Sequence, residues 1–412
     1  MAKKIVITGV GASSPLGGTA PESWAALLAG ESGVRTLPYK WVEQYDLPVH
    51  FAGEAKVRPD QVLERPVAKR LDPSSQFALV AALEALADAG NPEVAPERLG
   101  VDWATGIGGV WSLLDAWDTL REKGPRRVMP LTVPMLMPNA PSAAVSMHLE
   151  ARAYARTVAS ACASSTESLV NAYEHLQLGL ADVVIAGGSE SAIHPITVAA
   201  FSSMQALSRR NDSPETASRP YAVDRDGFVM GEGGAALIVE TEEHALARGA
   251  RIYAELAGGG ITSDSYHITA PEPEGLGASR AVRLALETAG ASPDEVTHIN
   301  AHATSTPTGD GAEYNALRSV FGDRIDGIPV SATKAAHGHL LGGTGALEAV
   351  FTVLALRDRL APPTINVAEQ DPEIPLTISA QPMPLGDGPQ LALSNSFGFG
   401  GHNAVVAIRS YS

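Results

Sequence analysis

The feature that most limits the fold of this chain is an alternation between short apolar runs and longer segments with helical spacing. The alternation begins with an apolar run at residues 4–8 and continues to two last runs at 391–394 and 403–408. Strands that alternate with helices along a chain form parallel sheets that are covered by helices on both faces. The pattern therefore predicts an α/β fold with parallel sheets.

The same plan occurs twice along the 412 residues. In the first part the pattern predicts strands at 98–104, 157–161 and 182–186 and helices at 74–89 and 164–178. In the second part it predicts strands at 252–259, 297–300 and 329–331 and helices at 275–289, 310–321 and 343–357. We therefore expect two similar halves, residues 1–250 and residues 251–412.

Charge and hydropathy exclude several classes of protein. The chain has 30 basic and 46 acidic residues, a net charge of −16, which argues against broad binding of nucleic acid. Its longest apolar stretch, 341–356, contains Glu348 and is shorter than the ~20 residues that cross a bilayer. A single cysteine excludes an intramolecular disulfide. We expect a soluble, cytoplasmic protein with neither a membrane nor a nucleic-acid partner.

Cys162 is the first candidate for chemistry. It lies in TVASACASSTESL, between an apolar run and a helical segment, where small neighbours permit a sharp turn. Helix N-terminal N–H groups stabilise a thiolate and lower the pKa of the thiol. The position is typical of a nucleophile at a strand-to-helix elbow. The alternative is a buried structural cysteine, which is a common fate of a lone one.

Two histidine-bearing loops could supply the partners that a nucleophilic cysteine needs. His302 follows the predicted strand 297–300, and His339 lies in SATKAAHGHLLGGTG together with Lys334 and His337. The ends of parallel strands are where α/β folds build their sites. The alternative is that each histidine is a satisfied core or loop residue. His337 and His339 form an H-x-H pair, but no HExxH motif or second cysteine accompanies it, so no metal site is predicted.

Two glycine-rich segments remain. NSFGFGGHN, residues 395–403, has a backbone that can approach a ligand closely and could supply an oxyanion donor or a gate. The alternative is a plain turn before the last strand. GVGASSPLG, residues 9–17, matches half of a dinucleotide-binding fingerprint, but Ser14 replaces its third glycine. We therefore interpret this segment as a structural turn and predict no cofactor.

With these loops together, the sequence resembles the condensing enzymes of the thiolase superfamily, and among them the β-ketoacyl-[acyl-carrier-protein] synthases II, especially actinobacterial members. The resemblance runs through the whole chain, in VITGVGASSPLG, ACAS, ALSRRNDSPETASRPYAVDRDGFVMGEGG, ITSDSYHITAP, HATSTPTGD, KAAHGH and NSFGFGGHN. It implies a five-layered αβαβα fold of two related halves, which works as a homodimer. It also implies the elongating condensation of type II fatty-acid synthesis, with no catalytic cofactor, because the substrates arrive on the phosphopantetheine of acyl-carrier protein.

The resemblance assigns roles to individual residues. Cys162 would accept the acyl group, His302 and His339 would complete a Cys-His-His set, and Lys334 would order the site with Glu348 behind it. The N–H groups of Cys162 and Phe399 would form the oxyanion hole, and Phe399 would gate it. Contacts to the pantetheine arm are implied for Thr304, Thr306 and Thr269, and an acyl pocket is implied for Ile107, Ala192 and Phe201. A structural cation is implied near Asn300, Glu348, Ser394 and Asn395.

An acidic carrier protein needs local positive charge on this acidic chain. The basic pairs Lys69–Arg70 and Arg209–Arg210 are candidates, and the alternative for each is an ordinary solvated charge.

The sequence departs from the family pattern at three places. Ala303 stands where the family has glycine, and its methyl group is expected to tighten the loop or to require a negative φ. His337 replaces a small polar or apolar residue, and Ser165 and Thr166 follow the nucleophile in place of the usual glycine and its neighbour. These changes leave open a specialised ketosynthase of a polyketide pathway or an inhibitor-tolerant duplicate.

Two rivals of other kinds are disfavoured. A non-catalytic chain-length-factor-like partner subunit would lack the cysteine, and a degradative thiolase would carry a second cysteine near its C-terminus. The chain has Cys162 and no other cysteine.

Overall fold

The computed structural model describes residues 3–411, and within them ten strands form one mixed sheet. The first five are β1 (Ile5–Ser13), β4 (Leu99–Ala104), β5 (Tyr154–Val158), β6 (Val183–Glu190) and β7 (Gly233–Thr241). The others are β8 (Ala254–Ser263), β9 (Val296–Asn300), β10 (Val330–Ser331), β13 (Leu391–Gly398) and β14 (His402–Ser410).

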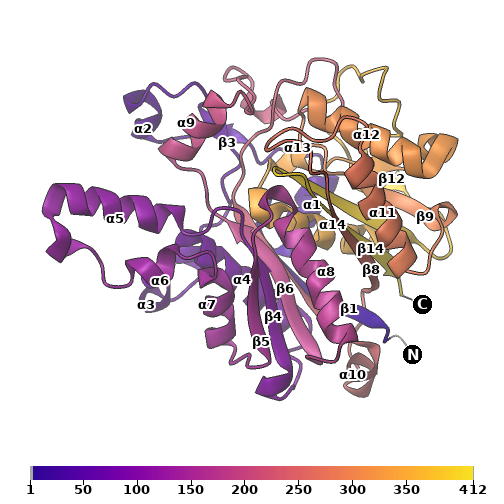
Figure 1. The fold of residues 1–412 in the computed structure, drawn as a ribbon, viewed down its shortest axis with the longest axis horizontal. Coiled ribbons are helices and arrows are strands. Elements are labelled where there is room, and N and C mark those ends of the chain that lie inside the picture. Colours follow the sequence, from indigo (N-terminus) through magenta and orange to yellow (C-terminus); the bar gives the residue numbers. More distant parts are fainter. Residues whose placement is uncertain (1–2, 412) are drawn as a thin grey trace.

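The sheet is built from two groups of five strands with the same topology. From the middle outward, one group runs β1-β7-β6-β4-β5 and the other runs β8-β14-β13-β9-β10. The pairings match one for one, two antiparallel and then two parallel in each group. Between residues 3 and 411, the strands of the two groups pair with each other only where β1 meets β8, through Val6 with Glu255 and Ile7 with Ala254. The fold therefore consists of two related halves (Figure 1). The dividing residue predicted at 250 lies between α10 (Glu242–Ala247) and β8.

The predicted parallel pairing occurs in the outer strands of each group and is wrong for the inner ones. β7 runs antiparallel to both β1 and β6, and β14 runs antiparallel to both β8 and β13. These strands are antiparallel because the connection that precedes each of them ends at the same edge of the sheet from which it started. The excursion at 191–232 leaves β6 at Glu190 and returns beside it at Gly233, and a tight turn links β13 to β14 at Gly398 and His402.

Helices complete five layers in the order α-β-α-β-α. In the middle, α8 (Ser164–Gln177) and α14 (Thr344–Asp358) contact strands of both groups. One outer face carries α4 (Pro73–Asp88) and α7 (Ala140–His148), and the other carries α11 (Leu276–Thr288) and α12 (Pro307–Phe321). A helix between the two halves of the sheet is buried on all sides and needs apolar residues all round, which explains why Glu348 stands out within α14.

The remaining elements lie outside these layers. They are α1 (Ala20–Leu28), β2 (Arg35–Thr36), α2 (Lys40–Gln44), β3 (Phe51–Ala52), α3 (Arg65–Ala68), α5 (Val110–Lys123), α6 (Thr132–Leu136), α9 (Pro195–Ser203), α13 (Lys334–His337), β11 (Leu360–Ala361) and β12 (Met383–Pro384). The helix α5 extends away from the sheet (Figure 1) and has no buried residue, although Leu113, Trp117 and Leu120 lie at helical spacing in its sequence. No helix between residues 3 and 411 is long and apolar enough to cross a membrane.

Candidate active site

The nucleophile elbow is a single 3₁₀ turn, Ala161–Ala163, that leads directly into α8. The expected strand 157–161 is wrong at its end, because β5 stops at Val158 and Ala161 takes a left-handed conformation with φ 51°. Ser164 stabilises this turn, since its hydroxyl donates to the Ala161 carbonyl at 2.6 Å and accepts from the Ser160 N–H at 2.9 Å. The turn presents Cys162 to a cavity of about 470 Å³ while leaving it only 9% exposed.

Both predicted histidines meet Cys162 at this cavity. His302 follows β9, and His339 lies between α13 and α14. One ligand atom from each of the three residues lies within 4.8 Å of the other two, and all three are buried. The two imidazole rings stand nearly perpendicular at 84°, with their centroids 5.6 Å apart. The fold thus brings together residues that are far apart along the chain, since Cys162 and His339 are separated by 177 positions.

Thr344 orients His339. The Thr344 hydroxyl lies 2.9 Å from Nδ1 of His339, while Nε2 is buried and has no partner within the described residues. A hydroxyl that donates to Nδ1 places the hydrogen of a neutral imidazole on Nε2. This tautomer offers an N–H donor to whatever occupies the cavity.

Lys334 and Glu348 form a buried ion pair behind the histidines. Nζ of Lys334 donates to Oε1 of Glu348 at 2.6 Å and also to the carbonyl oxygen of His302. Lys334 is 1% exposed and Glu348 is fully buried. Burial raises the pKa of Glu348 to about 7, although the neighbouring Lys334 charge acts to lower it. The pair fixes the His302 backbone and puts a positive charge next to the site.

Glu313 is a functional residue that the sequence reasoning missed. Its two carboxylate oxygens accept the N–H groups of His302 and Ala303, each at 2.8 Å, and Oε1 also accepts Nδ2 of Asn395 at 3.1 Å. The available signal was an acidic pair, Asp310 and Glu313, spaced i, i+3 on the helix that follows the His302 loop.

The histidines are uncharged in this environment. Burial, with the Lys334 charge, places the pKa of His302 and of His339 well below the usual 6.5. The expected lowering of the Cys162 pKa was wrong, because burial raises it to about 11. Lys334 and the N–H groups of Phe399 and Cys162 act in the opposite direction but do not overcome burial. The resting site therefore holds a thiol between two neutral imidazoles.

The β13–β14 turn completes the site around the sulfur. A side chain at Gly398 would place its Cβ 3.0 Å from the Cys162 nitrogen and 2.9 Å from the Ser160 carbonyl, so this strand end needs glycine. The close approach brings the Phe399 N–H to the Cys162 sulfur. Two backbone donors near one sulfur are the arrangement of an oxyanion hole.

Comparisons with known proteins give the family that the sequence motifs indicated. The family model described as beta-ketoacyl synthase, N-terminal domain matches residues 2–245, and the C-terminal domain model matches residues 253–368. The chain belongs to the β-ketoacyl synthase family. It is 44% identical to 3-oxoacyl-[acyl-carrier-protein] synthase 2 of Staphylococcus aureus, over 99% of both chains. It is 42% identical to the protein of the same name from Mycobacterium tuberculosis, over 99% of this chain and 97% of the relative.

Solved structures show the same likeness in three dimensions. A type II polyketide ketosynthase in complex with its acyl-carrier protein, bound to the hexaketide, superposes with a TM-score of 0.92 at 32% identity and covers all of both chains. A beta-ketoacyl synthase from Burkholderia phymatum superposes with a TM-score of 0.90 at 36% identity, again over all of both chains.

The cavity of this synthase holds most of the residues predicted to contact substrate. Its lining includes Ile107, Phe201, Thr269, Thr304 and Thr306. The lining does not include Ala192, which is fully buried in a neighbouring hydrophobic cluster that contains Leu341, a lining residue. Phe399 is half-buried and lines the cavity on the side of the β13–β14 turn.

The four basic residues proposed for docking differ in their surroundings. Arg209 is exposed. It lies beside the cavity, because its backbone N–H donates to the carboxylate of Asp226, which lines the cavity. Arg210 forms ion pairs with Asp224 at 3.0 Å and Asp226 at 3.5 Å, so its charge is largely compensated. Lys69 and Arg70 are exposed and, within residues 3–411, have no ion-pair partner. Lys69 lines a second cavity, away from Cys162.

The departures from the family pattern have structural explanations. Ala303 adopts φ 35°, so the expectation of a negative φ was wrong, and the Glu313 carboxylate holds this strained backbone. His337 is buried against Phe351 with Nε2 3.1 Å from the Thr333 hydroxyl, and burial lowers its pKa to about 3. Ser165 accepts the N–H of Ala346 at 2.9 Å, which connects α8 to α14.

Four buried oxygens close to the ion pair lack partners within the described residues. They belong to the residues predicted to hold a structural cation and are Oδ1 of Asn300, Oε2 of Glu348, Oγ of Ser394 and Oδ1 of Asn395. Asn300 and Ser394 face each other on β9 and β13, and Nδ2 of Asn300 donates to the Glu348 carbonyl at 3.1 Å. A buried set of oxygen donors with one carboxylate suits a hard cation.

Proposed function

We propose that the protein is a β-ketoacyl-acyl-carrier-protein synthase that elongates acyl chains in type II fatty-acid synthesis. The observation that carries the proposal is the convergence of one thiol and two neutral imidazoles at a single cavity. A hydrolase needs one base and a water, whereas two N–H donors aimed at one point suit a thioester enolate. The 44% identity to 3-oxoacyl-[acyl-carrier-protein] synthase 2 supports the fatty-acid assignment over the polyketide one.

The first half-reaction transfers the acyl group to Cys162. Because the thiol is protonated at neutral pH, its proton must leave as the sulfur attacks. The neutral imidazole of His302 accepts it, since Nε2 of His339 already carries a hydrogen. The tetrahedral oxyanion lies against the N–H groups of Cys162 and Phe399. The carrier thiolate then departs and takes the proton, so the products are acyl-Cys162 and free carrier thiol.

The second half-reaction forms the carbon–carbon bond. Malonyl-carrier protein loses CO2, and the electron pair of the broken bond forms an enolate whose oxygen accepts from His302 and His339. The enolate carbon attacks the acyl-Cys162 carbonyl, and Cys162 leaves as a thiolate that takes a proton from solvent. The product is 3-oxoacyl-carrier protein. Neutral imidazoles that donate N–H groups suit this step, because the negative charge moves from the malonyl carboxylate to the thioester oxygen only as CO2 leaves.

The partner would be an acyl-carrier protein, as one solved relative is in complex with its acyl-carrier protein. Arg209 is the best placed of the predicted basic residues, because it lies beside the cavity through Asp226. Lys69 and Arg70 offer uncompensated charge at a different place. We expect the phosphopantetheine arm to pass Thr269, Thr304 and Thr306, which line the cavity.

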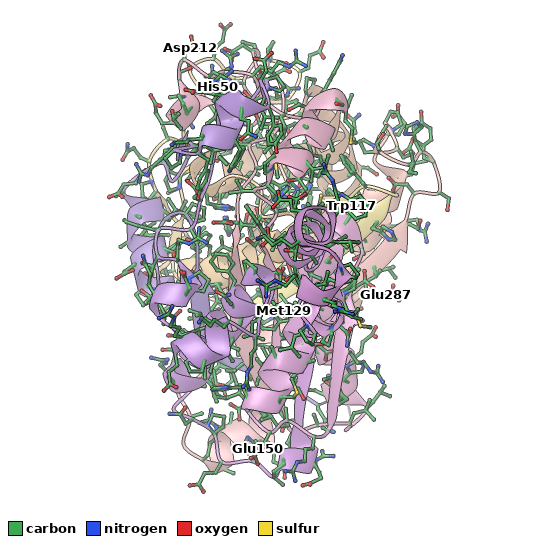
Figure 2. The ribbon with its side chains drawn as sticks, turned by 90° about the vertical axis from the view of Figure 1, so that its left-hand side faces the viewer. His50, Trp117, Met129, Glu150, Asp212 and Glu287 are labelled. Atoms are coloured by element: carbon green, nitrogen blue, oxygen red, sulfur yellow. The ribbon has the colours of Figure 1, made fainter. Side chains whose placement is uncertain are left out.

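We also propose that the synthase is a homodimer. β5 is the edge strand of the first half and is partly exposed, and an uncovered edge strand pairs readily with another chain. The α5 region also exposes large apolar side chains, including Leu113 at 50% and Trp117 at 54% (Figure 2, where Trp117 and Met129 are labelled). Exposed apolar patches of this kind mark protein interfaces. The cytoplasmic location stays a prediction.

The four unpartnered oxygens support a further proposal, that Asn300, Glu348, Ser394 and Asn395 hold a structural cation. A bound cation would satisfy these oxygens and stabilise the Glu348 carboxylate, and no step of the reaction passes through it. The proposal predicts that the unfolding temperature depends on which cation is present, K⁺ or Na⁺ against a large organic cation at equal ionic strength.

The function is tested with the purified protein and its Cys162→Ala variant. Each is incubated with acyl-carrier proteins of several chain lengths, the transfer is followed by intact mass, and malonyl-carrier protein is then added. Acyl-enzyme and 3-oxoacyl product that form only with the wild type would support the proposal. Acylation by polyketide starters alone would favour the polyketide alternative, and no acyl-enzyme from any donor would refute both.

A further inference from the structure

Glu190, at the C-terminal end of β6, has a buried carboxylate that the reaction described above does not use. Oε2 accepts the N–H of Gly106 at 2.7 Å and the N–H of Gly342 at 3.1 Å. Oε1 accepts the Thr105 hydroxyl at 2.9 Å and the N–H of Ile107 at 3.2 Å. Each oxygen therefore accepts two hydrogen bonds, and the four donors belong to two segments of the chain, residues 105–107 and Gly342.

The contacts favour the ionised form of this group, although burial raises its pKa. Three of the four partners are backbone N–H groups, which can only donate. The fourth, the Thr105 hydroxyl, accepts the N–H of Gly108 at 3.1 Å and so has its own hydrogen available for Glu190. Since these partners include no acceptor that requires a carboxylic O–H, the geometry is that of a carboxylate.

The two connected segments both border the catalytic cavity. One is the turn at 105–109, which carries Ile107 in the cavity wall. The other is the 3₁₀ turn Leu341–Gly343, which begins two residues after His339. They pass so closely that a Cβ on Gly342 would lie 2.1 Å from the Gly106 nitrogen, and a Cβ on Gly106 would lie 2.7 Å from Oε2 of Glu190. The carboxylate thus occupies the point where the wall of the cavity meets the His339 loop.

We propose that Glu190 is a positioning residue that sets acyl-chain specificity, because its carboxylate holds the Ile107 turn and the turn after His339 against each other. The proposal rests on the proposed condensing function. With Glu190 ionised, the Ile107 turn stays fixed beside the cavity and limits the length of the acyl chain. Release of the Ile107 N–H lets this turn move away, which favours longer chains.

The isosteric variant Glu190→Gln tests this idea selectively. The amide –NH₂ of Gln would face donors whichever oxygen it replaces. Its least costly place is the Oε1 position, because the Thr105 hydroxyl there can rotate and accept. Gly106 and Gly342 then keep their acceptor, and the Ile107 N–H loses its partner. We expect the ratio of condensation rates with long against short acyl donors to rise roughly 2- to 10-fold, the worth of one hydrogen bond.

A second readout distinguishes this role from a merely structural one. The Glu190 charge acts to raise the pKa of Cys162, so the variant should be alkylated by iodoacetamide at lower pH than the wild type. The matched control is Glu232→Gln, another buried carboxylate, which binds Ser191 and Ala55 instead of the two turns. It should leave both the donor ratio and the alkylation profile unchanged.

Three outcomes decide the matter. A folded Glu190→Gln protein with the wild-type donor ratio would overturn the proposal, as would an equal shift in Glu232→Gln. If Glu190→Gln does not fold, Thr105→Ala is the second variant. It keeps the carboxylate but removes the hydroxyl that ties the same turn to Oε1 of Glu190 and to the Gly108 N–H, so it should loosen the turn and shift the ratio in the same direction, and no shift would refute the idea. Failure of the condensing function itself is distinguishable, because wild-type protein would then form no acyl-Cys162.

Discussion

Removal of the Lys334 charge tests how much the buried Lys334–Glu348 ion pair contributes to the free energy of unfolding. In Lys334→Met, buried Glu348 would lose its 2.6 Å partner and the charge that lowers its pKa, and the His302 carbonyl would lose a donor. Breaking one side of a buried ion pair costs about 3–5 kcal/mol. For 412 residues that unfold as one unit, the entropy of unfolding is about 0.9 kcal/mol/K, so the Tm should fall by about 3–6 °C.

The double variant Lys334→Met/Glu348→Gln is the matched control for this prediction. It removes both charges, so it should recover most of the lost free energy of unfolding. Differential scanning fluorimetry of the wild type, Lys334→Met, Glu348→Gln and the double variant closes the cycle. Since Lys334 acts to lower the pKa of Cys162, iodoacetamide should label both variants only at higher pH than the wild type. A single variant within about 1 °C of wild type, or a double variant no more stable than the single one, would refute the reasoning.

Three shorter predictions follow from other parts of the site. With a Cys162 pKa of about 11, alkylation of the free enzyme should accelerate about tenfold per pH unit between pH 7 and 10, and a plateau below pH 8 would show that the thiolate already forms near neutrality. Ala303→Gly should relieve the left-handed strain at φ 35° and stabilise the protein by about 1 kcal/mol, seen as a rise in Tm; an unchanged or lower Tm would contradict it. Arg209→Glu should raise the KM for acyl-carrier protein several-fold at low salt and leave kcat and the KM for a small acyl thioester unchanged, whereas an equal change with both donors would place Arg209 outside the docking surface.

The sequence was most informative where a local pattern coincides with a local structure. The helices at 164–178 and 343–357 were predicted within one residue of α8 and α14 at each end, because each has a clear apolar pattern and a glycine or small-residue start. The cavity contains Cys162, His302 and His339 as the motifs predicted. The loops of these residues lie at strand ends, which the topology brings together.

What the sequence could not predict depends on tertiary structure. The antiparallel direction of β7 follows from where a 42-residue excursion ends, which no local pattern encodes. The high pKa of Cys162 follows from burial that the helix N-terminal position did not reveal. Glu313 and Glu190 act on backbone N–H groups of distant loops, so neither forms a motif with the residues it serves.

The most direct test of the central claim separates the two half-reactions in variants of the histidines. Wild type, Cys162→Ala and His302→Ala/His339→Ala are each given acyl-carrier protein and then malonyl-carrier protein, and the acyl-enzyme, CO2 and 3-oxoacyl product are measured. The account predicts that Cys162→Ala forms no acyl-enzyme, and that the double histidine variant still forms some acyl-enzyme but releases no CO2 and makes no product. Release of CO2 at the wild-type rate without both histidines would contradict the assignment of the enolate site.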